Sequence, residues 1–468
     1  MKKRINRRYF IALGSAFALG GCKSWKGGFP AITAVRSPNG LLRHASIGVW
    51  NKGRTDIEAI RTHKMIEMAA FCDVDASYLA KWKSVFPNAR FYRDWREMLE
   101  AEGDRIDSVT VSAPDHHHLA MATAAMRRGK HVYLQKPMAK THEEAAYLRQ
   151  VARECGVVTQ MGTQLVALKS ERQVIELIRS GVLGPVEHVY LFSTRKGVSR
   201  RRRIVPTVAP VPENLDWNLW LGSAAERPYA KDVYHPLLWR IWRDLGSGWV
   251  GDIGCHLIAA AWTGMDLGSK AIRDVWAETI TDAEDGVKDM VWPTAAHIVW
   301  NFDGVPASGG KPFKFEWFDG CSEPDALAPA NFRPPAEIDA LYAKSSFGKR
   351  PLEGKAVKCA NGWILQPHGA AQAVALSLDG RQVAVPEVPE QPSHYHEFVD
   401  CCLAGKAATT DFAWSTYMRE CAIAGEIAER VQGAKLAWDA KRRRFDNDAA
   451  NAFLTRPYRA GWEIPGLS

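Results

Sequence analysis

Short apolar segments alternate with helical segments between residues 45 and 162, and this alternation constrains the fold more than any other feature of the sequence. The expected strands cover residues 45–49, 68–71, 108–112, 132–134 and 157–161. Continuous apolar runs separated by helices are typical of parallel strands that are buried on both faces. The sequence therefore predicts a doubly wound parallel α/β sheet over residues 43–162.

A lysine stands where the fourth of these strands ends. The segment 129–139 reads GKHVYLQKPMA, and Pro137 stops the strand that precedes it. Proline also keeps the residue before it out of helical geometry. Open α/β sheets bind ligands at the carboxyl ends of their strands, which makes Lys136 a candidate site residue. On spacing alone, a surface lysine beside a turn fits equally well.

The first strand leads into GVWNKG at 48–53, which has the position of a dinucleotide-binding fingerprint. Gly48 and Gly53 match its first and third glycines. Trp50 occupies the middle position, where glycine normally lets the backbone approach a pyrophosphate. Asp73 follows the second strand, 25 residues beyond Gly48. An acid there binds an adenosine ribose and repels a 2′-phosphate, which favours NAD over NADP. A helix-capping carboxylate is the alternative for Asp73.

The second half of the chain predicts a different architecture over residues 163–468. Its expected strands cover 186–194, 274–280, 295–302 and 312–318. Little helix separates the last three, so an open, mostly antiparallel sheet is expected. An irregular stretch at 195–246, rich in Trp, Pro and Arg, suits either sugar binding or the packing of a lid onto a core.

Asp252 and His256 stand four residues apart at the start of an expected helix. That spacing places two side chains on one helix face. A carboxylate beside an imidazole orients the ring and raises its basicity, which suits a dehydrogenase that must remove a hydroxyl proton. A capping aspartate and a buried histidine are the structural alternative.

As an ordered set, these motifs resemble the Gfo/Idh/MocA oxidoreductases. The family's Glu-Lys-Pro hallmark stands here as Gln135-Lys136-Pro137, and its Asp-x-x-x-His pair falls on Asp252 and His256. The resemblance covers roughly residues 45 to 465. It implies a Rossmann domain followed by an α/β domain with an open, largely antiparallel sheet.

The resemblance also implies roles for individual residues. Lys136 would hydrogen-bond the reacting oxygen, and His256 would be the general acid/base with Asp252 as its partner. The residues expected to hold NAD are Gly48, Asn51, Lys52, Gly53, Asp73, Pro114, His118, Gln135, Lys136 and Gln164. Family members are commonly dimers or tetramers, so a homo-oligomer is expected.

Three functions fit these residues. The first is an NAD-dependent oxidoreductase acting on a hydroxyl of a sugar, polyol or glycoside. The second is a redox-neutral enzyme that cleaves or epimerises glycosides and takes its hydride back from a tightly bound cofactor. The third is a non-catalytic sugar-binding protein, which only Trp50 favours.

The first 22 residues are expected to be a signal peptide, and residues 23–42 a linker. Arg7-Arg8 resembles a twin-arginine export signal, and the LGGC at 19–22 resembles a lipobox with Cys22 as a lipid anchor. An ordinary secretory signal and an unmodified thiol are the alternatives. We therefore expect an exported bacterial protein, either periplasmic or membrane-anchored.

Charge and metal-ligand patterns exclude two further classes of function. Cleavage of the signal would lower the net charge from +9 to about +4, too small an excess to indicate nucleic-acid binding. The arginines at 200–203 are expected in a solvated loop. The adjacent histidines at 116–118 lack a nearby acid to complete a metal site, so no metal is expected. Eight cysteines without metal or CxxC spacing are expected to be mostly free and buried.

Overall fold

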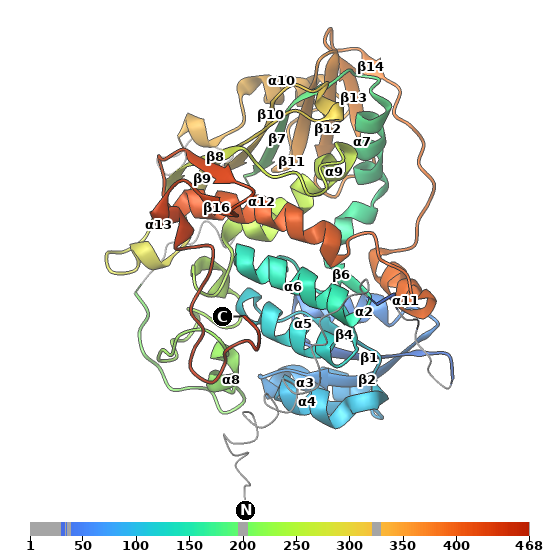
Figure 1. The fold of residues 1–468 in the computed structure, drawn as a ribbon, viewed down its shortest axis with the longest axis vertical. Coiled ribbons are helices and arrows are strands. Elements are labelled where there is room, and N and C mark those ends of the chain that lie inside the picture. The colour runs from blue at the N-terminus through green and yellow to red at the C-terminus, as the bar shows by residue number, and fades with distance from the viewer. Residues whose placement is uncertain (1–29, 33, 35–38, 195–204, 321–328, 468) are drawn as a thin grey trace, which may run out of the picture.

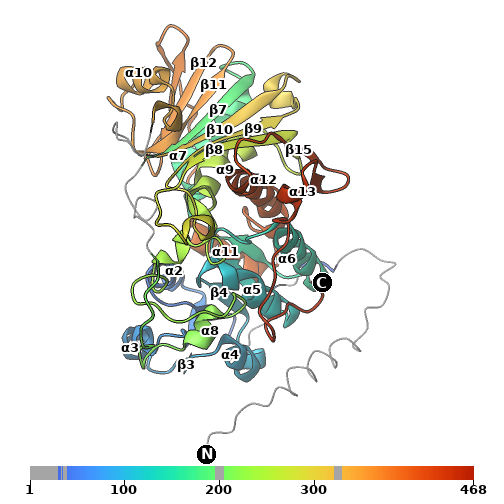
Figure 2. The same ribbon diagram turned by 90° about the vertical axis from the view of Figure 1, so that its left-hand side faces the viewer.

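The computed structural model describes residues 30–32, 34, 39–194, 205–320 and 329–467 (Figure 1). The predicted signal peptide with Cys22 and the arginines at 200–203 lie outside these ranges. Two sheets form opposite ends of the molecule, and helices α6 (His142–Cys155) and α12 (Phe412–Arg430) lie between them (Figures 1 and 2). The predicted α/β fold with two different sheets is confirmed.

The first sheet has six parallel strands in the order β3-β2-β1-β4-β5-β6. The strands are β1 (Leu42–Ile47), β2 (Ile66–Cys72), β3 (Arg90–Tyr92), β4 (Ser108–Val111), β5 (His131–Leu134) and β6 (Thr159–Met161). The other helices of this part are α2 (Lys52–Ile60), α3 (Ala76–Val85), α4 (Trp95–Glu102) and α5 (His118–Arg127). The strand order reverses between β1 and β4, which is where such sheets bind dinucleotides. The sequence did not predict β3, because its three residues are only half buried.

The second sheet has ten strands in the order β14-β13-β12-β11-β7-β10-β9-β8-β15-β16. They are β7 (Val186–Ser193), β8 (Asp274–Ile280), β9 (Ala295–Phe302), β10 (Phe313–Asp319), β11 (Glu353–Cys359), β12 (Gly362–Pro367), β13 (Val374–Ser377), β14 (Gln382–Val383), β15 (Leu436–Asp439) and β16 (Arg444–Phe445). Every described pair is antiparallel except β7 with β10, so the predicted mostly antiparallel sheet is confirmed.

Helices cover this second sheet unevenly. The remaining helices are α7 (Lys169–Ser180), α8 (Trp217–Leu221), α9 (Cys255–Gly264), α10 (Ala336–Lys344), α11 (His394–Ala404) and α13 (Asp448–Asn451). Helices α7, α9 and α12 contribute to the large core beneath the sheet, whereas α10 packs Ile338 and Tyr342 in a separate apolar cluster. The sequence did not predict β11 to β14. One reason is Lys355, a fully buried lysine in β11 whose ammonium lies 2.5 Å from a carboxylate oxygen of Glu171.

Residues 205–246, which we call the strap, reach back from the second half of the chain to the first sheet. An antiparallel bridge joins Leu215 of the strap to Asp75, just before α3. Both views place α8, a helix of the strap, beside the end of the molecule that holds α3 and α4 (Figures 1 and 2). Most of its aromatic residues form an apolar cluster of their own, which fits the lid-packing alternative, while sugar binding by this stretch stays a prediction.

Local contacts fix the start of α6. The side chain of Thr141 accepts from the Glu144 N–H, and the carboxylate of Glu144 accepts from the Lys140 N–H. The seven cysteines in the described ranges are all free. No helix in those ranges is long and apolar enough to cross a membrane.

Candidate functional site

A cleft of about 580 Å³ lies at the carboxyl ends of the parallel strands, and the strap forms its opposite wall. Pockets of this size are typical of small-molecule sites. Ten of the predicted site residues line it: Gly48, Asn51, Lys52, Asp73, Pro114, Gln135, Lys136, Gln164, Asp252 and His256. The structure therefore brings together residues that are far apart in the sequence, while their individual roles stay predictions.

The turn between β1 and α2 requires both of its outer glycines. Gly48 has a φ of 77°, and a Cβ there would lie 2.7 Å from the carbonyl of Ser112. A Cβ on Gly53 would lie 2.0 Å from the oxygen of Gly48. Helix α2 begins here with no acidic residue in its first turn, so its free N–H groups and dipole favour an anion such as a pyrophosphate.

Trp50, the residue in place of the middle glycine, forms part of the cleft wall. Its indole stacks on Tyr78 of α3, with ring centroids 5.0 Å apart and an angle of 13° between the planes. Offset stacking of this kind holds both rings in place. The bulky residue at the phosphate turn is therefore fixed against the wall beside β2 and α3.

Asp73 presents its carboxylate to the cleft from the end of β2. Its oxygens accept hydrogen bonds from the backbone N–H groups of Val49 at 2.9 Å and Asp75 at 3.0 Å. Burial raises the pKa of Asp73 to about 6. Asp75, not Asp73, caps α3 by accepting from the Ser77 N–H, so the helix-cap alternative does not describe Asp73. The fingerprint glycines and this acid together fit a dinucleotide.

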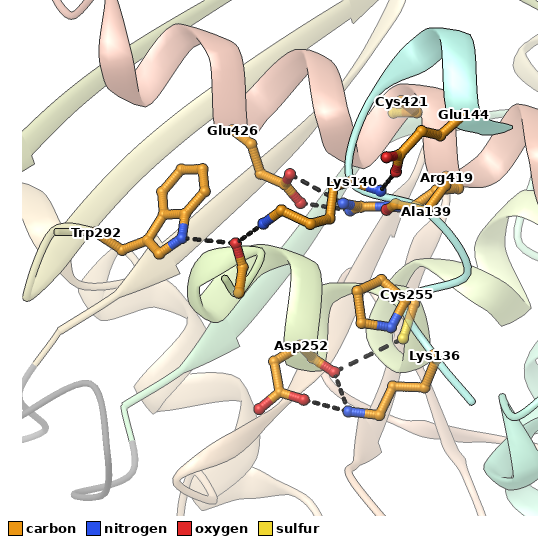
Figure 3. Close-up of polar contacts among 12 residues, drawn as sticks. Lys136, Ala139, Lys140, Glu144, Asp252, Cys255, Trp292, Arg419, Cys421 and Glu426 are labelled. Atoms are coloured by element: carbon orange, nitrogen blue, oxygen red, sulfur yellow. Dashed lines mark hydrogen bonds and ion pairs between the residues drawn. The ribbon is translucent and has the colours of Figure 1, made fainter. Parts of the chain in front are cut away.

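Lys136 and Asp252 form an ion pair at the other end of the cleft (Figure 3). The ammonium donates to the Asp252 carboxylate and, at 2.6 Å, to the Asp252 carbonyl oxygen. Burial acts to lower the pKa of Lys136, but the charge of Asp252 outweighs it and the pKa is raised. Lys136 is therefore a fixed, protonated hydrogen-bond donor.

The predicted partnership of Asp252 with His256 stays a prediction, because none of the described contacts joins their side chains although both line the cleft. Residues Val250–Gly254 form a π turn, η6, that leads into α9. Asp252 instead binds Lys136, and its second oxygen lies 3.5 Å from Nε of Arg240. The buried His256 has no hydrogen-bond partner at Nδ1 within the described residues. Burial, followed by the nearby charge of Lys136, lowers the pKa of His256 well below its usual value.

The predicted cofactor contact of His118 stays a prediction, although His118 does not line the cleft. His118 is buried at the start of α5, with Nδ1 2.8 Å from the carbonyl oxygen of Pro137 and Nε2 2.9 Å from that of Ala113. It holds two strand-end loops together and does not line the cleft, whereas His117 does. Within the described residues, no group of three His, Cys, Asp or Glu side chains could hold a metal ion.

Asp56 explains why a glutamine stands in the hallmark motif, and sequence reasoning missed it. Gln135 is buried, and its Nε2 donates to Asp56 at 2.9 Å. Asp56 also accepts from Lys52, Ser112 and Tyr395 at 2.5 to 2.8 Å. A glutamate at position 135 would place two buried carboxylates in contact, whereas the amide supplies the donor that Asp56 needs.

The strap supplies the other residues that sequence reasoning missed. Trp220, His235, Trp239 and Arg240 all line the cleft. They come from a stretch without helical or strand periodicity, so only its content of aromatic residues and arginine indicated a site.

We predict that Gln135→Glu lowers the free energy of unfolding by about 1–3 kcal/mol, because it leaves an unpaired buried carboxylate. Asp56→Asn should restore most of this loss in the double variant, which denaturant unfolding will measure. The matched control is Gln150→Glu, an exposed residue that also faces a carboxylate, Glu154. It should cost about 0.5 kcal/mol or less. Equal losses for the two glutamates would contradict this account.

Comparison with known proteins identifies both halves of this architecture. Residues 42–163 match the model of the Gfo/Idh/MocA oxidoreductase family, NAD-binding Rossmann fold. Residues 171–284 match the model of that family's C-terminal α/β domain. Together the two matches cover about half of the chain.

Similar proteins fall into two groups. Glycosyl hydrolase family 109 proteins of Solibacter usitatus and Shewanella baltica are each 28% identical, over 204 and 187 residues. These matches cover 40% and 38% of this chain, which spans 45% and 40% of the relatives. The aldose-aldose oxidoreductase of Caulobacter crescentus, complexed with glycerol, superimposes with a TM-score of 0.57 at 17% identity over 85% of this chain and 99% of its own. A levoglucosan dehydrogenase in complex with NADH and levoglucosan has a TM-score of 0.55 at 16% identity, covering 83% and 96%.

Proposed function

The chain belongs to the Gfo/Idh/MocA family of oxidoreductases, and from that premise we propose that it oxidises or reduces a hydroxyl-bearing carbon of a sugar, polyol or glycoside with NAD. The observation that carries the proposal is the fixed ammonium of Lys136 beside His256, at one end of a cleft whose other end has dinucleotide features. The sugar-linked structures with the same fold support the substrate class.

The cleft residues fit NAD. The turn at Gly48 and the N-terminus of α2 would hold the pyrophosphate, and Asp73 would accept from the ribose hydroxyls. The negative charge of Asp73 supports NAD over NADP, because a 2′-phosphate would be repelled. When bound, NAD supplies the nicotinamide that exchanges hydride with the substrate carbon.

The two polar residues at the opposite end divide the proton chemistry. Lys136 is protonated and held by Asp252, so it would donate a hydrogen bond to the reacting oxygen. His256 is neutral because its pKa is lowered, so it would accept the hydroxyl proton. His256 is buried and the Lys136 side chain is only 12% exposed, which limits the competition of water for the same hydrogen bonds.

We predict that Lys136→Met reduces turnover by about 10²- to 10⁴-fold, because the reacting oxygen loses its charged donor. Steady-state kinetics and the NAD content by mass spectrometry will measure both properties. The double variant with Asp252→Asn removes the carboxylate left unpaired and keeps the test valid if the single variant unfolds. Lys64→Met, at an exposed position, is the control. Unchanged turnover in the folded variants would disprove the role of Lys136.

We predict that activity is retained as the pH falls through 6.5 and declines only at lower pH. A base works in its deprotonated form, and the lowered pKa of His256 extends that form to more acidic solution. The pH profile of kcat/KM will measure the acid limb. His256→Gln should lower kcat/KM about 10²- to 10⁴-fold and remove this limb. A limb centred at or above pH 6.5 that His256→Gln leaves in place would contradict the assignment.

A second candidate is a redox-neutral enzyme that cleaves or epimerises glycosides, and the strap favours it. The strap is fastened on both sides of the proposed cofactor groove. On the β2 side, the Ala76 N–H donates to the Asn214 oxygen at 2.9 Å, and the Asp216 N–H donates to the Val74 oxygen at 3.0 Å. On the β4 side, Nε2 of His117 lies 2.7 Å from the Trp220 oxygen.

A cofactor enclosed in this way would leave slowly, so its hydride would return to the same substrate within one turnover. Oxidation of a ring hydroxyl acidifies the neighbouring C–H bond, which permits elimination or inversion before the hydride returns. The similarity to glycosyl hydrolase family 109 proteins supports this candidate. Release of an aryl alcohol from an aryl glycoside without added NAD distinguishes it from net oxidation.

We predict that the double variant Asn214→Ala and His235→Ala loses bound NAD at least about 10-fold faster, because both side chains tie the strap to Asp75. Asn214 donates to Asp75 at 2.6 Å, and Nε2 of His235 lies 3.2 Å from the same carboxylate. NAD content after dilution and gel filtration will measure the loss. Asn331→Ala, which breaks an exposed hydrogen bond to Glu278 on the second sheet, is the control. Equal retention by both variants would disprove retention by the strap.

Export, a lipid anchor and self-assembly complete the proposal. Arg7-Arg8 and the sequence before Cys22 support export through the twin-arginine route and lipidation. Free NAD is scarce outside the cytoplasm, so export also supports a cofactor that travels inside the folded protein. Family resemblance supports a homo-oligomer. Cell fractionation of the full chain and of Cys22→Ala tests the anchor.

A further inference from the structure

Arg240 is a cleft residue that neither the dinucleotide features nor the Lys136–Asp252 pair requires. It lies in the 3-10 turn η5 (Leu238–Ile241) of the strap, and its side chain is 25% exposed. Its guanidinium lies over the ring of Trp239, 4.2 Å from the centroid. Nε is 3.5 Å from an oxygen of Asp252, and Nη1 donates to the Leu237 oxygen at 3.4 Å. Nη2 takes part in neither of these contacts, and Arg240 lines the cleft.

The charges at this end of the cleft do not balance. Lys136 and Arg240 share a single carboxylate, Asp252, through its two different oxygens. The other carboxylates that line the cleft act elsewhere. Asp73 lies at the end of β2, and Asp115 acts on the buried Lys140 and His118. Lys136 and Arg240 thus face one carboxylate between them, so these three groups carry an excess of one positive charge where the substrate would bind.

The charged groups near His256 are also positive. Its pKa is lowered first by burial and then by the nearby charge of Lys136, and Lys52 acts in the same direction. A neutral ring in a positive surrounding does not offset the excess at Arg240. Uncompensated charge in a half-buried cleft is costly, so a ligand of opposite sign would bind there favourably.

We propose that Arg240 recognises a carboxylate of the substrate, so that the sugar acted on beside Lys136 and His256 is a sugar acid or a uronide. A guanidinium matches a carboxylate through two parallel hydrogen bonds, and its stacking on Trp239 fixes the plane in which it presents them. One surplus charge matches a monoanion, whereas a phosphate dianion would add a second negative charge. This inference rests on the proposed function and adds its substrate class.

The test compares matched pairs of ligands on the NAD-loaded protein: glucose with glucuronate, galactose with galacturonate, and methyl glucoside with methyl glucuronide. Isothermal titration calorimetry measures binding. We expect at least one acid to bind ten-fold or more tightly than its neutral partner. Arg240→Gln should weaken binding of that acid about 10- to 100-fold and leave the neutral sugar little changed. Arg240→Lys should keep only part of the preference, because it retains the charge without the planar fork.

Two controls distinguish the loss of carboxylate recognition from a general loss of folded structure. Arg105→Gln removes an arginine whose side chain is 56% exposed, outside the cleft, and should change nothing. Arg240→Gln should retain the NAD content of the parent chain. Raising the ionic strength should weaken binding of the acid more than binding of the neutral sugar.

Three results would overturn the inference: neutral sugars that bind as tightly as their acids, no binding of any acid, or tighter binding of glucose 6-phosphate than of glucuronate. Each of them, obtained on protein that holds NAD, leaves the proposed oxidoreductase function in place. A chain that binds no NAD overturns that function together with this inference.

Discussion

The site depends on one partly buried ion pair that joins the first half of the chain to the second. Lys136 follows β5 of the parallel sheet, and Asp252 lies in the π turn before α9. Backbone anchors hold both ends. Lys140 donates to the carbonyl oxygens of Arg243 and Gly246, and Arg419 donates to that of Ala139 at 2.7 Å (Figure 3). Because each anchoring charge is buried, a small shift of either segment would break hydrogen bonds that water cannot replace.

This ion pair also determines which group in the site donates a hydrogen bond and which group accepts a proton. A carboxylate that served His256 would raise its pKa and leave Lys136 without a counter-charge. The structure gives the carboxylate to the lysine, so the pKa of Lys136 is raised and that of His256 is lowered. Environments that push two pKa values apart assign one group as donor and the other as acceptor.

The sequence predicted the parts of the molecule that follow from burial. Parallel strands such as β4 and β5 are apolar on both faces, so their pattern stands out, and the strand ends then place Lys136 and Asp73 in one cleft. Pairing inside the site was not predictable in the same way. The contact of Asp252 with Lys136 and that of Asp56 with Gln135 join side chains that are far apart in the sequence and meet only in three dimensions. The strap has no periodicity that could place its residues.

The strap is connected to the phosphate turn through Tyr78. Trp50 stacks on Tyr78, and the hydroxyl of Tyr78 lies 3.3 Å from Nε2 of His235 in the strap. The bulky residue at the fingerprint is thereby joined to the segment that closes the groove. An enzyme that exchanges its cofactor at every turnover must open such a groove each time, and opening would then limit its rate. An enzyme that returns the hydride to the same substrate can keep the groove closed, which is why the contacts that fasten the strap bear on the proposed redox-neutral alternative.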